Sequence, residues 1–201
     1  MKRKSFFLLL LRMSFTWFNE PKQWSSNESV IKVHTDGKTD FWRKTHYGFE
    51  RDNGHFYYRS FAGDQSLTAT VNVHGQYNTL YDQGGLMLRI DGQNWIKCGV
   101  EYVEGKQYAS VVVTVNGWSD WSIVAINSPD VLKLRVKREK EAVHIEYAEG
   151  ENGEYRMMRL AYFPVIDKTK VLMAGIMCAS PGDDTQGFDI SFEGLNIREN
   201  E

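Results

Sequence analysis

Charged and aromatic side chains are predicted to share one face of three strands in the middle of the chain. Successive residues of a strand point to opposite faces of the sheet, so residues two apart lie together. The strands are expected at 85–90, 96–102 and 108–115. Their polar face is expected to carry Arg89, Trp95, Lys97, Glu101 and Tyr108. Sugars present apolar ring faces and polar edges, so a face that mixes aromatic rings with carboxylates and cations suits a carbohydrate.

The apolar residues of these strands predict how the strands pair. A three-residue connection at 92–94 places Leu88 opposite Cys98, and a two-residue turn at Glu104-Gly105 places Cys98 opposite Val111. Opposed residues share a face, so this register makes one face of the three strands wholly apolar. The apolar pattern therefore indicates which side of the strands faces the core.

The same register predicts the spacing of the charges. Arg89 is expected opposite Lys97, and Glu101 is expected opposite Gly85. Two directly opposed cations repel each other unless a carboxylate or a bound group lies between them. Arg89 and Lys97 together would suit a sugar acid or another carboxylate. The alternative is an ordinary sheet face covered by solvent.

Other side chains with chemistry suited to a sugar lie elsewhere in the sequence. These candidate ligand-binding residues are Trp42, His55, Tyr57, Tyr81, Asp82, Gln83, Asp120 and Trp121. For each aromatic residue the alternative is strand packing or a place in the core. For Asp82 and Asp120 it is hydrogen bonding at a turn or strand end, and for His55 a structural hydrogen bond.

Glycoside cleavage would need two carboxylates at one bond, about 5–5.5 Å apart for retention or 6.5–9.5 Å apart for inversion. No paired-carboxylate strand motif is found, although Glu101 with Asp82 or Asp120 leaves this alternative open. The sequence has no nucleophile elbow, phosphate loop or histidine pair with metal-ligand spacing. Asp183-Asp184 is a weak calcium signal for which a solvated loop is the alternative. We therefore expect a non-catalytic protein without cofactor or metal.

Alternating segments that could position these side chains occur along most of the chain. Short alternating segments such as 66–74, 131–137, 142–147 and 188–193 are separated by Gly, Asn and Asp turns. This pattern predicts an all-β antiparallel sandwich or barrel. We expect one domain at 15–201, after a disordered or misassigned segment at 1–14.

Composition and chain ends limit the location and partners of the protein. The 201 residues carry 24 basic and 26 acidic side chains, so the formal net charge is −2, which argues against a nucleic-acid partner. The basic start and the apolar run at 6–11 resemble a secretory signal, but this run is shorter than such a signal needs. No segment approaches the roughly 18 apolar residues of a membrane span. We expect a cytoplasmic protein in which Cys98 and Cys178 are core thiols.

Several motifs together resemble the regulation-of-enolase family, otherwise described as a domain of unknown function. They are FTWFNEP at 15–21, TDFW at 39–42, DNGHFY at 52–57, YDQGGLM at 81–87, WIKCGVE at 95–101 and SDWS at 119–122. The resemblance covers about residues 15–197 and implies a concanavalin A-like β-sandwich, or jelly roll, with two curved sheets and a concave face. It implies no known reaction.

Two hypotheses of function follow, with a third held open. The preferred one is non-catalytic binding of a carbohydrate or sugar acid on the concave sheet. The second, which the family name suggests, is a regulatory protein that binds a metabolic enzyme such as enolase through an exposed patch. The third is a glycoside-active enzyme.

Overall fold

The computed structural model describes residues 14–164, 166–182 and 186–200. The predicted segment 1–14 lies outside these residues except for Ser14. In the described parts of the chain, no helix is long and apolar enough to cross a membrane.

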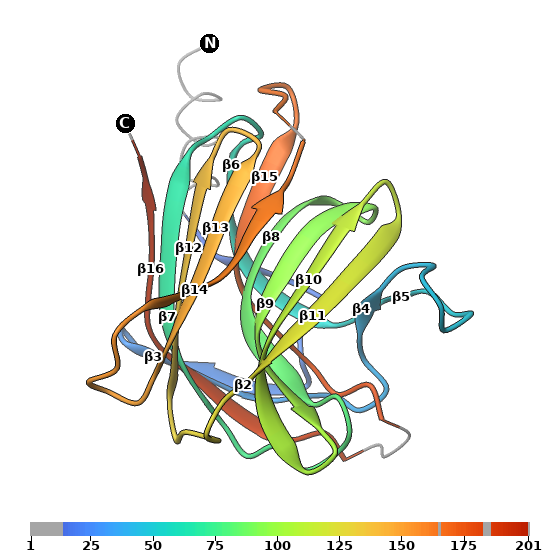
Figure 1. Ribbon diagram of the computed structural model, residues 1–201, viewed down its shortest axis with the longest axis vertical. Coiled ribbons are helices and arrows are strands. Elements are labelled where there is room, and N and C mark those ends of the chain that lie inside the picture. Colours follow the sequence, from blue (N-terminus) through green and yellow to red (C-terminus); the bar gives the residue numbers. More distant parts are fainter. Residues whose placement is uncertain (1–13, 165, 183–185, 201) are drawn as a thin grey trace.

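Two seven-stranded antiparallel sheets form the body of the fold (Figure 1). The strand order of the first sheet is β1 (Thr16–Phe18), β6 (His55–Ala62), β15 (Val171–Ala179), β8 (Gln83–Asp91), β9 (Asn94–Val103), β10 (Lys106–Val115) and β11 (Trp118–Ala125). That of the second is β14 (Arg156–Tyr162), β13 (Ala142–Glu149), β12 (Leu132–Glu139), β7 (Leu67–Gly75), β16 (Asp189–Glu199), β3 (Val30–His34) and β2 (Gln23–Ser26). The predicted all-β sandwich is confirmed.

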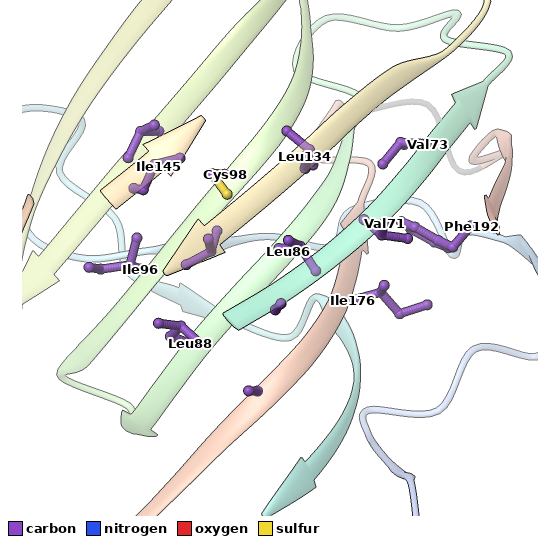
Figure 2. Packing of buried hydrophobic residues seen from close by; sticks show 14 of the residues in the cluster. Val71, Val73, Leu86, Leu88, Ile96, Cys98, Leu134, Ile145, Ile176 and Phe192 are labelled. Atoms are coloured by element: carbon purple, nitrogen blue, oxygen red, sulfur yellow. The ribbon is translucent and has the colours of Figure 1, made fainter. Parts of the chain in front are cut away.

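The main core lies between the two sheets (Figure 2). Strand β12 shows why: Leu132, Leu134 and Val136 are buried, whereas Lys133 and Arg135, which alternate with them, are less so. Cys98 of β9 packs in this layer, as the apolar pattern predicted. Cys98 and Cys178 are both buried free thiols.

The predicted pairing of β9 with β10 is confirmed. Val100 lies opposite Ala109, and Cys98 lies opposite Val111. The turn residues Glu104 and Gly105 both have positive φ angles, +49° and +81°. Two positive φ values are what a type I′ turn requires, and this turn fixes the register of a two-residue hairpin.

The predicted pairing of β8 with β9 is wrong by two residues. Leu86, not Leu88, lies opposite Cys98, and the register shifts between Arg89 and Asp91. The connection is a two-residue turn, because Asp91 pairs with Asn94. A bulge adds one residue to a strand without a partner, and apolar periodicity does not reveal it.

This correction changes the neighbours of the charged residues. Met87 lies opposite Lys97, and Gln83 lies opposite Glu101. Arg89 lies opposite Trp95, so the two cations are not directly opposed. A shift of two residues keeps every side chain on its predicted face.

A second apolar layer covers part of the outer face of the first sheet, the face turned away from the second sheet. A small hairpin of β4 (Phe41–Trp42) and β5 (Arg51–Asp52) stands beside the sheet in Figure 1. Its Phe41 is fully buried, and its ring lies edge-on to Trp95 at 6.2 Å. The buried members of this layer are Phe41, Trp42, Phe56, Met87, Trp95, Val112 and Met177. The layer divides the face into a covered half and an open half.

Candidate functional site

A cavity of about 430 Å³ lies on the open half of this outer face. Strands β8 to β11 supply Gln83, Lys97, Glu101, Val112 and Trp121. The rest of the lining comes from Asp40, Trp42, Tyr47, Phe49, Arg51, Thr79, Leu80, Tyr81, Pro181 and Gly182. Its volume falls within the range of small-molecule sites.

The structure brings part of the predicted site together here. The predicted residues that line the cavity are Trp42, Tyr81, Gln83, Lys97, Glu101 and Trp121. They come from four motifs that are separated in the sequence. The antiparallel pairing of β8 to β11 places Gln83, Lys97, Glu101 and Trp121 on one surface, and Trp42 of β4 and Tyr81, which precedes β8, join them there.

Glu101 is the most unusual of these residues. Its side chain is buried, and Oε2 accepts hydrogen bonds from Ser110 Oγ at 2.6 Å and Trp121 Nε1 at 2.7 Å. Its Oε1 atom accepts no hydrogen bond from the described part of the chain and is not fully enclosed, and the residue lines the cavity. Burial raises the pKa of Glu101 above its usual value despite the nearby Lys97 charge.

Lys97 is held in a buried network beneath the cavity. Its ammonium group donates to Asp40 Oδ1 at 3.1 Å, to the Phe41 carbonyl at 2.8 Å and to Gln83 Oε1 at 2.6 Å. An ammonium group has three protons, so these acceptors satisfy it completely. The lysine thus ties the β4 strand to the sheet.

Tyr81 reaches the cavity from a strained backbone. Its φ angle is +68°, which is rare for a bulky residue and is often found where a site fixes a side chain. The Tyr81 N–H donates to the Tyr102 carbonyl at 2.7 Å, and the Tyr81 ring lies edge-on to Trp121 at 6.2 Å. The backbone therefore aims this ring at the cavity.

Asp82, next in the chain, has a structural place instead. Its fully buried carboxylate accepts from the backbone N–H groups of Asn78 and Thr79 at 2.8 Å, and from Ser180 Oγ at 2.6 Å. It therefore holds the turn that positions Tyr81, in the manner of the turn alternative considered for it.

Arg89 and Trp95 lie on the predicted face, but under the covered half. Arg89 forms a two-pronged ion pair with Asp52, at 2.7 and 2.8 Å, and its guanidinium lies 4.5 Å from the centre of the Phe18 ring. Trp95 is fully buried. Phe18 and Phe41 supply this cover, and long-range contacts of this kind are not encoded in the strand alternation.

His55 is also a structural residue. Its Nδ1 atom donates to the Asn19 carbonyl at 2.7 Å, so Nε2 is free to accept from the Asp36 N–H at 3.0 Å. This pattern fixes the neutral ring, and burial lowers the pKa of His55. Its neighbour Tyr57 packs instead against Trp17.

Tyr108 and Asp120 lie away from the cavity lining. Tyr108 is half-buried opposite Glu101, on the predicted face. Asp120 lies opposite Val113, on the other face of the sheet, where it pairs with Arg159 at 3.1 Å. Neither Asp82 nor Asp120 therefore joins Glu101 at the cavity, and the second cavity carboxylate is Asp40.

Sequence reasoning missed several lining residues, chiefly Asp40, Tyr47, Phe49 and Arg51. Asp40 belongs to the TDFW motif, which could have signalled it. Tyr47 and Phe49 are each 43% exposed, in the loop between β4 and β5. Aromatic residues on both sides of a glycine in a polar loop were the available signal.

No group of three metal-ligating side chains occurs within the described ranges. Asp183 and Asp184, the weak calcium signal, lie outside the described residues.

The family described as a protein of unknown function (DUF1349) matches residues 17–200. The chain belongs to this family. It is 39% identical over 179 residues to "Regulation of enolase protein 1" of Saccharomyces cerevisiae, an alignment that covers 88% of this chain and 85% of that protein. The resemblance seen in the motifs is thereby confirmed.

Solved structures agree with the fold. The crystal structure of a functionally unknown Saccharomyces cerevisiae protein superposes with a TM-score of 0.83 at 36% identity, covering 93% of this chain and 97% of that one. The carbohydrate-binding module CBM66 from Bacillus subtilis superposes at 0.55 with 15% identity, covering 90% and 94%. At that identity the second likeness shows the shared sandwich alone.

Proposed function

We propose that the protein binds a carbohydrate or sugar acid, without catalysis, in the cavity on the outer face of the first sheet. The observation that carries this proposal is the lining itself. It sets the rings of Trp42, Tyr81 and Trp121 beside the polar groups of Gln83 and Glu101. Rings that cover the apolar face of a sugar, with polar atoms for its hydroxyls, are the usual composition of such a site.

Two further observations support this proposal. The left-handed backbone of Tyr81 costs free energy, of order 1–3 kcal/mol, that is commonly retained where a side chain serves a ligand. The sandwich is shared with a carbohydrate-binding module, which supports the proposal by analogy of fold.

Glycan-array screening followed by calorimetric titration tests the proposal. Glu101→Ala and Trp121→Ala should each weaken binding about 10–100-fold, because each removes a contact worth roughly 1.5–3 kcal/mol. Glu146→Ala, on the other sheet, is the matched control and should bind as the parent does, because Glu146 pairs with Arg135 away from the cavity.

Two results would count against the proposal. An array without signal at millimolar sugar would contradict sugar binding. Release of nitrophenol from nitrophenyl glycosides would contradict the absence of catalysis and favour glycoside hydrolysis, since Asp40 and Glu101 both line the cavity.

A second candidate is a regulatory protein that binds a metabolic enzyme such as enolase. The name of the yeast relative suggests it, and exposed apolar side chains at the ends of both sheets favour it. Strands β11 and β14 each lie at the end of a sheet, and several of their large apolar side chains are exposed. These are Trp118, Ile123, Val124, Met157, Leu160 and Tyr162. Exposed apolar side chains that gather into a patch commonly mark protein interfaces.

A pull-down from native extract distinguishes the two candidates. A stoichiometric enolase partner lost in Met157→Glu/Leu160→Glu, with sugar binding unchanged, would favour regulation. Recovery of no partner would count against it.

We propose that the protein resides in the reducing cytoplasm, which its two buried free thiols support.

A further inference from the structure

We infer that the cavity selects sugars that carry no carboxylate, because its two deeply buried acids keep free acceptor oxygens, whereas its deeply buried cation, Lys97, has no free proton. This inference rests on the proposed sugar binding and specifies the class of sugar.

The two cations first considered as carboxylate partners are already engaged. Lys97 gives its three protons to Asp40, the Phe41 carbonyl and Gln83. Arg89 is paired with Asp52 through both terminal nitrogens, and it does not line the cavity. A ligand carboxylate could bind either cation only by breaking the hydrogen bonds that these buried side chains already form.

Arg51 is the other cation on the wall. Its Nη1 atom donates to the Lys38 carbonyl at 3.0 Å, and its guanidinium lies 5.6 Å from the centre of the Phe49 ring. Arg51 is half-buried in β5, whereas Asp40 and Glu101 are both over 90% buried. Lys97 is equally buried but has no free proton, so the deeply buried charged groups that can still bind a ligand are acidic, and Arg51 is the less buried cation.

Two carboxylate oxygens have no partner in the described part of the chain. They are Glu101 Oε1 and Asp40 Oδ2, since the side-chain hydrogen bonds of these acids use Oε2 and Oδ1. Neither oxygen is fully enclosed, and both residues line the cavity. Carboxylate oxygens accept strongly from hydroxyl groups. A second carboxylate beside them is repelled or must bind a proton.

The aromatic walls fit the same class of ligand. Trp42 and Trp121 have already committed their indole N–H groups, to the Thr45 carbonyl and to Glu101. These rings therefore offer apolar surface and add no donor for an anion. The volume of about 430 Å³ is near the lower end of the range for ligand sites, which suits one or two sugar units.

Matched sugars test the inference directly. The probes are glucose, galactose and mannose, each with its uronic acid and its 2-amino derivative, titrated by calorimetry and printed on an array as chain ends. We expect each hexose that binds to do so about tenfold or more tighter than its uronate, since one carboxylate contact is worth roughly 1.5–3 kcal/mol. Amino derivatives should bind at least as tightly as their hexoses.

Two variants make the result specific to the acids. Glu101→Gln should weaken hexose binding. It should also reduce the difference in affinity between hexose and uronate, because it removes the charge that repels the uronate. Glu146→Gln, on the other sheet, should change neither value. An unchanged gap in Glu101→Gln would overturn the role given to this acid.

The remaining outcomes separate the inference from the proposed function. Uronates that bind more tightly than hexoses would overturn the inference and leave sugar binding intact. Loss of that preference in Arg51→Gln would then identify Arg51 as the anion site. Absence of binding to all nine sugars, in solution and on the array, would overturn the proposed function and the inference together.

Discussion

Neutralising Asp40 should be one of the most destabilising single changes in this protein. Asp40 is the only charged partner of Lys97 among the described residues, and the two side chains are only 10% and 6% exposed. Asp40→Asn leaves the Lys97 ammonium group with neutral hydrogen-bond acceptors alone. Breaking a buried ion pair from one side costs about 3–5 kcal/mol. For a chain of this length that corresponds to a fall of roughly 6–20 °C in Tm.

The double variant Asp40→Asn/Lys97→Met makes the reasoning specific. It removes both charges, so no unpaired charge stays buried, and it should be more stable than Asp40→Asn alone. The coupling between the two sites should reach about 2 kcal/mol, within the range found for residues in one network. Urea unfolding followed by tryptophan fluorescence measures all the variants. Glu146→Gln, which breaks a more exposed pair, is the control and should cost about 0–1 kcal/mol.

The reasoning would be refuted by either of two results. One is a loss of less than about 1 kcal/mol in Asp40→Asn, which would mean that water reaches Lys97. The other is a double variant whose cost equals the sum of the single costs, since independent sites add.

Three other changes test the structure away from this pair. Because burial raises the pKa of Glu101, the protonated side chain stabilises the fold below its ordinary pKa of 4.5, and this stabilisation is lost as the pH rises through the raised pKa. Glu101→Gln should therefore raise the urea midpoint at pH 8 and leave it unchanged at pH 4. An equal change of the midpoint at both pH values would contradict this reasoning. Burial lowers the pKa of His55, so the protein should lose stability as the pH falls from 6.5 through the lowered pKa. In the same urea assay, the His55→Gln variant should lose less stability over that pH interval. A Cβ atom on Gly99 would lie 2.0 Å from the Gly84 carbonyl oxygen of the neighbouring strand. Gly99→Ala should therefore lower the free energy of unfolding by about 1–3 kcal/mol. An unchanged urea midpoint would show that β8 and β9 can separate freely.

The β9–β10 hairpin shows how far local sequence can predict the fold. Glu104-Gly105 suits only a few turn types, so the turn and the apolar alternation agreed on one register. In β8–β9 the two-residue turn and the bulge between Arg89 and Asp91 together changed the register by two residues. Apolar alternation has a period of two, so it could not detect that shift. The faces were predicted correctly although the opposite partners were not.

The candidate site was predictable only where the strands themselves form it. Lys97 and Glu101 reach the cavity because β9 places them on its outer face. Trp95 shares that face, but the ring of Phe41 covers Trp95. Phe41 lies more than fifty residues away in the sequence. The loop residues Tyr47 and Phe49 reach the lining by a long-range fold-back that no local period records.

The loop between β4 and β5 would give a ligand site in this cavity a way to change its specificity. Arg43 fixes the base of the loop by pairing with Glu50 and Asp52 and by donating to the Gly92 carbonyl. Tyr47 and Phe49 lie beyond that base and contact the cavity without joining the buried Lys97 network. Substitutions at these two positions can therefore alter the ligand at little cost to folding. Under the proposed function, relatives that share the sandwich and the network would be free to diverge in what they bind.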